Sequence, residues 1–143
     1  MASDPGLLRA LARAECVSLL SKGGVGRIGI TVGGLPVILP VNFAVLDDET
    51  VVFRTVTGTK LAAATRGAVV AFEVDDFEAD GSQGWSVLVR GVASEVTEAD
   101  LVERIQHLPL QAWAVGASAD HIVGISMVDV TGRRFGSPDA GPA

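Results

Sequence analysis

The chain is organised around residues 51–60, which read VVFRTVTGTK. The β-branched and aromatic residues from Val51 to Thr55 predict a strand. Gly58 permits a tight turn, and the alanine-rich segment after Lys60 predicts the start of a short helix. Backbone N–H groups at a helix start favour an anion, and Arg54 suits phosphate oxygens. The stretch predicts a strand, turn and helix that form either a phosphate-binding corner or an ordinary capped helix with solvated charges.

Composition narrows the class of protein. The 143 residues fit one domain, and 48% of them are apolar while 20% are charged, as in globular proteins. The net charge of −6 argues against a protein that grips nucleic acid through its phosphates. The one cysteine, Cys16, allows no internal disulfide, and its apolar helical setting predicts a buried thiol. The spacing of histidines and cysteines predicts no metal site.

The chain carries no segment that predicts a membrane location. The longest apolar run, residues 35–45, is interrupted by Pro36, Pro40 and Asn42 and is too short to cross a bilayer. The first residues lack a basic segment followed by an apolar one, so we expect no signal peptide. We therefore expect a cytoplasmic protein that does not bind membranes.

Strand patterns outnumber helix patterns along the chain. Strands are expected at 26–32, 35–45, 51–56, 69–74, 85–96 and 121–130, with a Gly33-Gly34 hairpin turn and an acidic turn at 47–49. Helices are expected at 5–21, after Lys60 and before Pro109. This order predicts a mainly β (α+β) fold, a six-stranded antiparallel barrel with short flanking helices. We expect one domain over residues 1–135 and a flexible tail over 136–143.

No self-sufficient catalytic set is evident in the sequence. His107 falls at a helix end, where a surface role is expected, and His121 is either a general base beside Asp120 or a structural residue. Asn42, Trp85 and Ser86 lie near strand ends and fit a binding site. If the protein is an enzyme, a cofactor is expected to carry the chemistry.

Four segments at these positions resemble one known family. VFRTVTGTK at 52–60, FEVDD at 72–76 and GWSVLVRG at 84–91, with PVNF at 40–43, are similar to the pyridoxamine 5'-phosphate oxidase-like family of FMN-binding split barrels. The resemblance covers residues 7 to 135. It implies a split β-barrel and a homodimer with two flavin sites at the subunit interface. It also implies an FMN-dependent oxidoreductase that acts on a small molecule.

The resemblance also assigns residues to the flavin. These are Asn42, Phe43 and Ala44 along the ring, Phe53, Arg54 and Thr55 on the next strand, Gly58, Thr59 and Lys60 at the phosphate, and Trp85 and Ser86 beside the ring. The phosphate corner read from the residues alone coincides with the phosphate site that the resemblance implies.

Two departures from the oxidase proper favour a different substrate. Leu39-Pro40-Val41 stands where the oxidase has a basic residue, and only Arg133 and Arg134 remain of its C-terminal substrate-binding segment. The alternatives are a deazaflavin-dependent reductase of the same fold, a flavin-storing or sensing module without turnover, and haem binding. The substrate, the electron donor and the role of Trp113 stay open.

Overall fold

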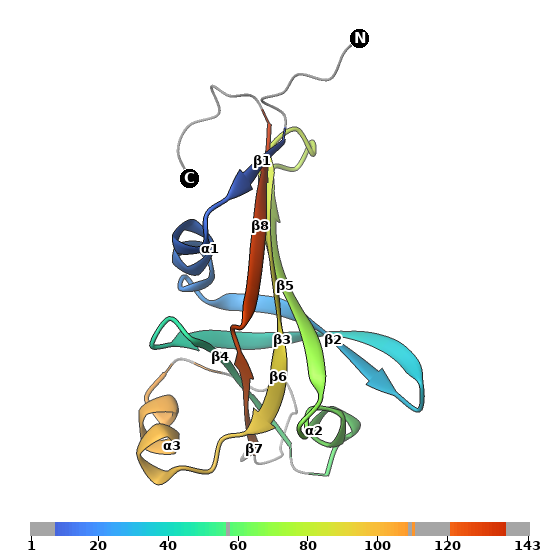
Figure 1. Cartoon of the computed structure of the whole chain (residues 1–143), viewed down its shortest axis with the longest axis vertical. Coiled ribbons are helices and arrows are strands. Elements are labelled where there is room, and N and C mark those ends of the chain that lie inside the picture. The colour runs from blue at the N-terminus through green and yellow to red at the C-terminus, as the bar shows by residue number, and fades with distance from the viewer. Residues whose placement is uncertain (1–7, 57, 109, 111–120, 137–143) are drawn as a thin grey trace.

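The structure is a computed structural model that describes residues 8–56, 58–108, 110 and 121–136 (Figure 1). The described part holds eight strands and three short helices. In chain order they are β1 Leu8–Leu11, α1 Arg13–Leu20, β2 Gly24–Val32, β3 Leu35–Leu46, β4 Thr50–Thr55, α2 Lys60–Ala64, β5 Val69–Phe77, β6 Gly84–Glu95, α3 Ala99–Gln106, β7 His121–Ser126 and β8 Asp129–Phe135.

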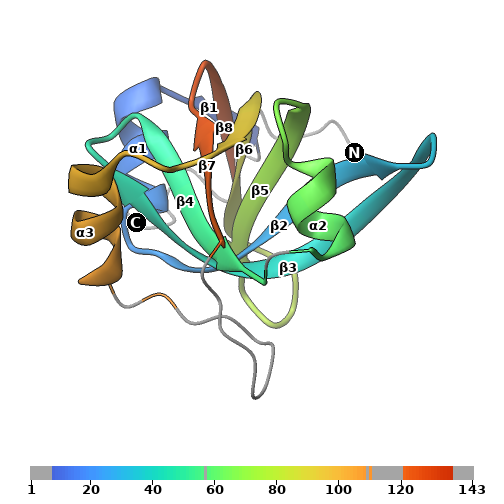
Figure 2. The ribbon, with the colours of Figure 1, turned by 90° about the horizontal axis from the view of Figure 1, so that it is seen from below.

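Six of the strands close into an antiparallel barrel in the order β6-β5-β2-β3-β4-β7, because β7 pairs back onto β6 (Figure 2). Strand β8 pairs with the first half of β6 and carries β1 on its outer edge. The predicted six-stranded antiparallel split barrel with short flanking helices is confirmed, and β1 and β8 add two strands to it. Among the described residues, no helix has the length and apolar character needed to span a bilayer.

Two turns set the register of β2, β3 and β4. Gly33 and Gly34 have φ of +58° and +81°, as a two-residue hairpin turn with the strand's own twist requires. The acidic turn uses Asp47 and Asp48, also at positive φ of +55° and +57°. Arg104 of α3 donates two hydrogen bonds, at 3.1 and 2.7 Å, to the Asp47 carboxylate. The turn therefore also anchors α3 against the barrel.

A bulge divides the last predicted strand into β7 and β8. Ala93 pairs with Ile125 and Arg90 pairs with Asp129, so two residues of β6 face three residues of the other strand. A Cβ at Gly91 would lie 1.8 Å from the Ser126 carbonyl oxygen, so only glycine fits opposite the bulge. The predicted single strand over 121–130 is therefore divided in two. Strand β7 ends at Ser126, and β8 begins at Asp129.

The helix predicted over residues 5–21 is wrong in its first half. Residues Leu8–Leu11 form β1, which pairs with β8, and the helix occupies only Arg13–Leu20. The exposed edge of β8 offers unpaired backbone groups, and pairing with them outweighs the helical spacing of the leucines. The expected helix cap near Pro5 lies outside the described residues.

Two apolar clusters form the core. The main cluster fills the barrel, where the Phe43 and Phe72 rings meet edge to face with centroids 4.9 Å apart. Helix α1 contributes Leu20 and the fully buried Cys16, so the expected burial of that thiol is confirmed. The second cluster lies between α3 and the outer side of β4 and β7. These clusters hold the end of β4 in a fixed place, and the candidate site begins there.

Candidate functional site

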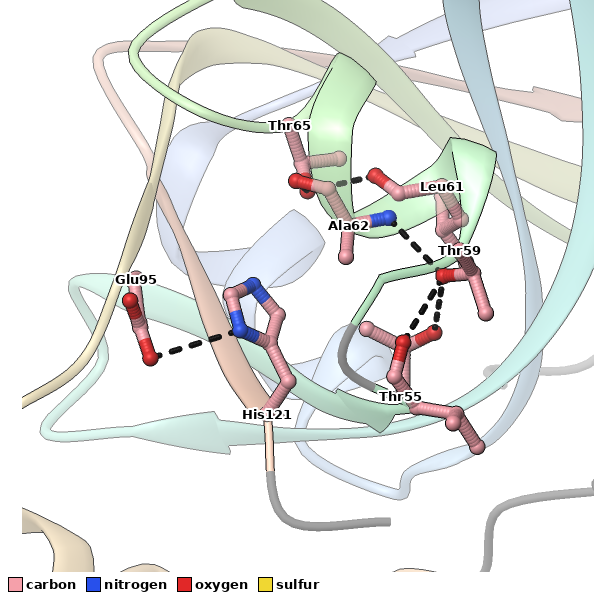
Figure 3. Close-up of polar contacts among 8 residues, drawn as sticks. Thr55, Thr59, Leu61, Ala62, Thr65, Glu95 and His121 are labelled. Carbon is pink, nitrogen blue, oxygen red and sulfur yellow. Dashed lines mark hydrogen bonds and ion pairs between the residues drawn. The ribbon is translucent and has the colours of Figure 1, made fainter. Parts of the chain in front are cut away.

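The turn between β4 and α2 has the geometry expected from the sequence. Strand β4 ends at Thr55, Thr59 caps the helix, and α2 begins at Lys60. The Thr59 hydroxyl accepts a hydrogen bond from the Ala62 N–H at 3.1 Å and donates one to the Val56 carbonyl at 2.9 Å. It also lies 3.4 Å from the Thr55 hydroxyl (Figure 3). These contacts tie the end of the strand to the start of the helix.

The same contacts define what Thr59 can offer a ligand. A threonine hydroxyl has one proton, and that of Thr59 is donated to Val56. Thr59 therefore orders the turn rather than donating to an anion. The first-turn N–H groups of a helix have no partner within it, so donors to an anion would come from the backbone. Gly58 has φ of +86° and is exposed, with nothing within 4 Å of the position a Cβ would take.

The expected site residues on β3 and β4 divide between the two faces of the sheet. Phe43 and Phe53 pair with each other, and both side chains lie in the core. Only their backbone could meet a ligand. Neighbouring residues point the other way, so Asn42, Ala44 and Arg54 face outward. Asn42 precedes Phe43 and Arg54 follows Phe53, so the two residues lie next to that pair on the outer face. Both are half-buried.

Trp85 and Ser86 lie far from this corner within one chain. They occupy the start of β6, opposite Arg134 and Arg133 of β8. The other end of β6, from Ala93 to Glu95, is the part that meets β7 beside the corner. Eight residues of strand separate Trp85 from Ala93, about 26 Å at the usual rise of a strand. The fold therefore gathers nine of the expected positions near β4 and leaves Trp85 and Ser86 apart.

Sequence reasoning left one feature of the corner unassigned. The described residues bury three polar or charged side chains, Thr55, Thr65 and His121, and all three lie around α2 (Figure 3). His121 Nδ1 lies 3.3 Å from Glu95 Oε2. Glu95 belongs to no recognisable sequence motif. It becomes a neighbour of His121 only through the pairing of β6 with β7. His107 is exposed at the end of α3, as expected, and Trp113 lies outside the described residues.

A charged cluster lies on the outer face of β2 and β5. Arg27 Nη1 is 3.2 Å from both Glu73 Oε1 and Asp75 Oδ2. Burial and the adjacent Asp75 carboxyl raise the pKa of Glu73 from 4.5 to about 7, against the opposing effect of Arg27.

Within the described ranges, no group of three or more His, Cys, Asp or Glu side chains is arranged to hold a metal ion.

Comparison with known proteins identifies the family. The family model described as pyridoxamine 5'-phosphate oxidase matches residues 12–134. The chain belongs to this family. The uncharacterized protein Rv0080 of Mycobacterium tuberculosis is 40% identical over 130 residues, which are 87% of this chain and 84% of that protein.

Solved structures of pyridoxamine 5'-phosphate oxidase-like proteins share the fold. The FAD binding protein from Mycobacterium smegmatis is 38% identical, with a TM-score of 0.69 over 90% of this chain and 98% of that one. A Corynebacterium glutamicum protein named after the same oxidase is 27% identical, with a TM-score of 0.78 over 99% of this chain and 100% of that one. The resemblance seen in the sequence motifs is thus confirmed.

Proposed function

We propose that this protein binds a flavin at the β4–α2 corner and is a cytoplasmic, flavin-dependent oxidoreductase acting on a small molecule. The observation that carries the proposal is the set of contacts that Thr59 makes with Thr55 and Val56, with Arg54 on the outer face beside them. The sequence resemblance assigns the flavin phosphate to residues 58–60. A turn fixed before the ligand arrives lowers the ordering cost of binding.

The residues present fit a flavin phosphate. Arg54 supplies a planar cation, Lys60 follows the capped turn in sequence, and Gly58 leaves the approach to the turn open. Asn42 and Ala44 face the same side of the sheet as Arg54. The flavin ring, when bound, supplies the electron-transfer chemistry. The protein's part is to bind the phosphate and to cover the ring.

FMN is the leading cofactor and FAD is the second candidate. A relative 38% identical to this chain is named an FAD binding protein. The open space at Gly58 is compatible with a longer diphosphate arm. The deazaflavin and haem readings of the sequence have no comparable support. A binding module without turnover shares the same site and differs only in lacking an electron donor.

The proposal includes a homodimer with the flavin between its two subunits. Trp85 and Ser86 lie far from the corner in one chain, so a second copy is the natural source of their contact with the ring. The outer sheet face exposes apolar side chains, of which Ile38 and Val69 are 72% and 76% exposed. Light scattering should give twice the chain mass of 14.7 kDa. A monomer at micromolar concentration would contradict this part.

The test of flavin binding is a titration of the purified protein with FMN, FAD, the deazaflavin coenzyme and haem. We expect FMN or FAD to bind with micromolar or tighter affinity and to survive gel filtration. Replacement of Arg54 with Ala should weaken that binding about tenfold or more, because a charge-assisted contact to phosphate is lost. Arg66→Ala, at an exposed arginine after α2, is the matched control and should bind as the wild type does. Absence of binding by any flavin would refute the proposal.

A further inference from the structure

The buried polar side chains of the described residues gather around α2. His121 is only 4% exposed and Thr65 only 1%, and with Thr55 they are the polar or charged residues that the described interior contains. Burial of a polar group is unfavourable unless the group is hydrogen-bonded, and an apolar side chain would fill the same space without that penalty. The Thr65 hydroxyl, at the end of α2, donates to the Leu61 carbonyl, whereas Thr55 and His121 lie at the β4–α2 turn.

Glu95 holds His121 from one side. The distance from Glu95 Oε2 to His121 Nδ1 is 3.3 Å (Figure 3). Glu95 is the last residue of β6, and β6 meets β7 over only three residue pairs, so the contact lies at the seam that closes the barrel. A carboxylate at this distance from Nδ1 can orient the imidazole ring.

Thr55 lies on the other side of His121. The two residues are direct partners in the β4–β7 register, and both side chains are buried. The Thr55 hydroxyl lies 3.4 Å from that of Thr59, which caps α2. In Figure 3 His121 extends from β7 toward α2. The Glu95–His121 ion pair, the β4–β7 pairing of His121 with Thr55 and the Thr55–Thr59 approach thus follow one another from the barrel seam to the turn.

We propose that His121, oriented by Glu95, is a positioning residue for the phosphate of the bound flavin. It supports Thr55, and through it Thr59 at the start of α2, and touches no part of the ligand. A smaller or unoriented side chain lets Thr55 and Thr59 shift, and the turn then loses its alignment with the phosphate. Asn42 and Ala44, which would lie along the ring, are on β3 and outside this turn, so their contacts with a flavin would be spared. The inference rests on the proposed flavin function.

The experiment compares the dissociation constants of FMN and riboflavin, which share a ring and differ in the phosphate. In the wild type FMN should bind more tightly. His121→Leu fills similar space without a donor, and we expect it to weaken FMN about tenfold while riboflavin changes by less than about twofold. His121→Asn places an amide N–H near the position of Nδ1 and should restore most of the preference. The exposed His107 provides the control, because His107→Leu should change neither constant.

Glu95→Ala gives a second test that leaves the core filled, because the Glu95 side chain is 47% exposed. It should fold even if His121→Leu does not, and it should lower the FMN preference in the same direction. Equal weakening of FMN and riboflavin, or an unchanged preference in Glu95→Ala, would overturn the positioning role. A wild type that binds neither compound nor FAD would instead refute the flavin function itself.

Discussion

The two helices that cover the barrel interior both bury apolar side chains, but they differ in the residues that lie beside them. Helix α1 buries Cys16, Leu19 and Leu20, and it packs so closely on β8 that a Cβ at Gly132 would lie 2.6 Å from the Cys16 sulfur. Helix α2 buries Ala62 above Thr55 and His121. The α1 side has the composition of a core that stabilises the fold. The α2 side retains polar groups whose burial is unfavourable, which is the compromise expected where a site must be shaped for a ligand.

The largest expected effect on stability comes from a substitution in the core beneath α1. Leu20→Ala removes a fully buried side chain and should lower the free energy of unfolding by about 2–5 kcal/mol, because it leaves a cavity. Urea unfolding followed by tryptophan fluorescence measures the loss. The preference for FMN over riboflavin should stay as in the wild type. Ser18→Ala, on the exposed side of the same helix, should change stability by less than about 0.5 kcal/mol. If Leu20→Ala lost the preference for FMN over riboflavin, the two sides would not have the separate roles described above.

Thr59→Val makes the matching change on the α2 side. It removes the hydroxyl that accepts from the Ala62 N–H, and loss of a helix cap typically lowers stability by about 1 kcal/mol. We expect the FMN dissociation constant to rise about tenfold relative to that of riboflavin, because the turn is no longer fixed. Thr59→Ser keeps the hydroxyl and should retain the preference. If Thr59→Val lowers stability without changing the preference, the α2 side is structural only.

The smallest expected effect is on the pH dependence of stability and concerns Glu73. This residue lies away from the β4–α2 corner, so its replacement tests whether a half-buried polar group outside the corner affects ligand binding. Its pKa rises from 4.5 in the unfolded chain to about 7 in the fold, so the folded state binds more protons between these values. The contribution of Glu73 to the free energy of unfolding is therefore fully present below about pH 4.5 and is lost as the pH rises through about 7. Glu73→Gln should remove that part of the decline in melting temperature.

The Glu73 effect should be modest because the half-buried cluster is partly screened by water. Glu78→Gln, in the exposed loop after β5, is the control and should keep the wild-type pH profile. The FMN preference at constant pH should be unchanged in both variants. A pH profile of Glu73→Gln that matches the wild type would contradict the raised pKa.

Local patterns were sufficient for the elements whose signals lie within a few residues. The Gly33-Gly34 turn and the strand, turn and helix at 51–60 depend on conformations that particular residues favour, so the sequence predicts them directly. Strand β1 could not be found in this way. Its leucine spacing fits a helix, and it is a strand only because β8, far along the chain, offers an edge.

The site shows the same limit. Arg54 and the capped turn were recognisable from residue types, but the burial of Phe43 and Phe53 depends on which face of the sheet each side chain takes. The contact between His121 and Glu95 was not visible, because Glu95 becomes a neighbour only when β6 and β7 close the barrel. Whether the two subunits share the flavin, as the resemblance implies, stays a prediction.

The pairing of β1 with β8 also has a consequence for the order of events in synthesis. Leu11 pairs with Gly132, so a strand made early cannot find its partner until the last described strand has left the ribosome. The closing β6–β7 pairs likewise wait for residues 123–125. Contacts between such distant segments form slowly, because a long loop of chain must first be ordered. The growing chain therefore exposes the apolar interior strands until β7 and β8 have been made, and the barrel closes only after them.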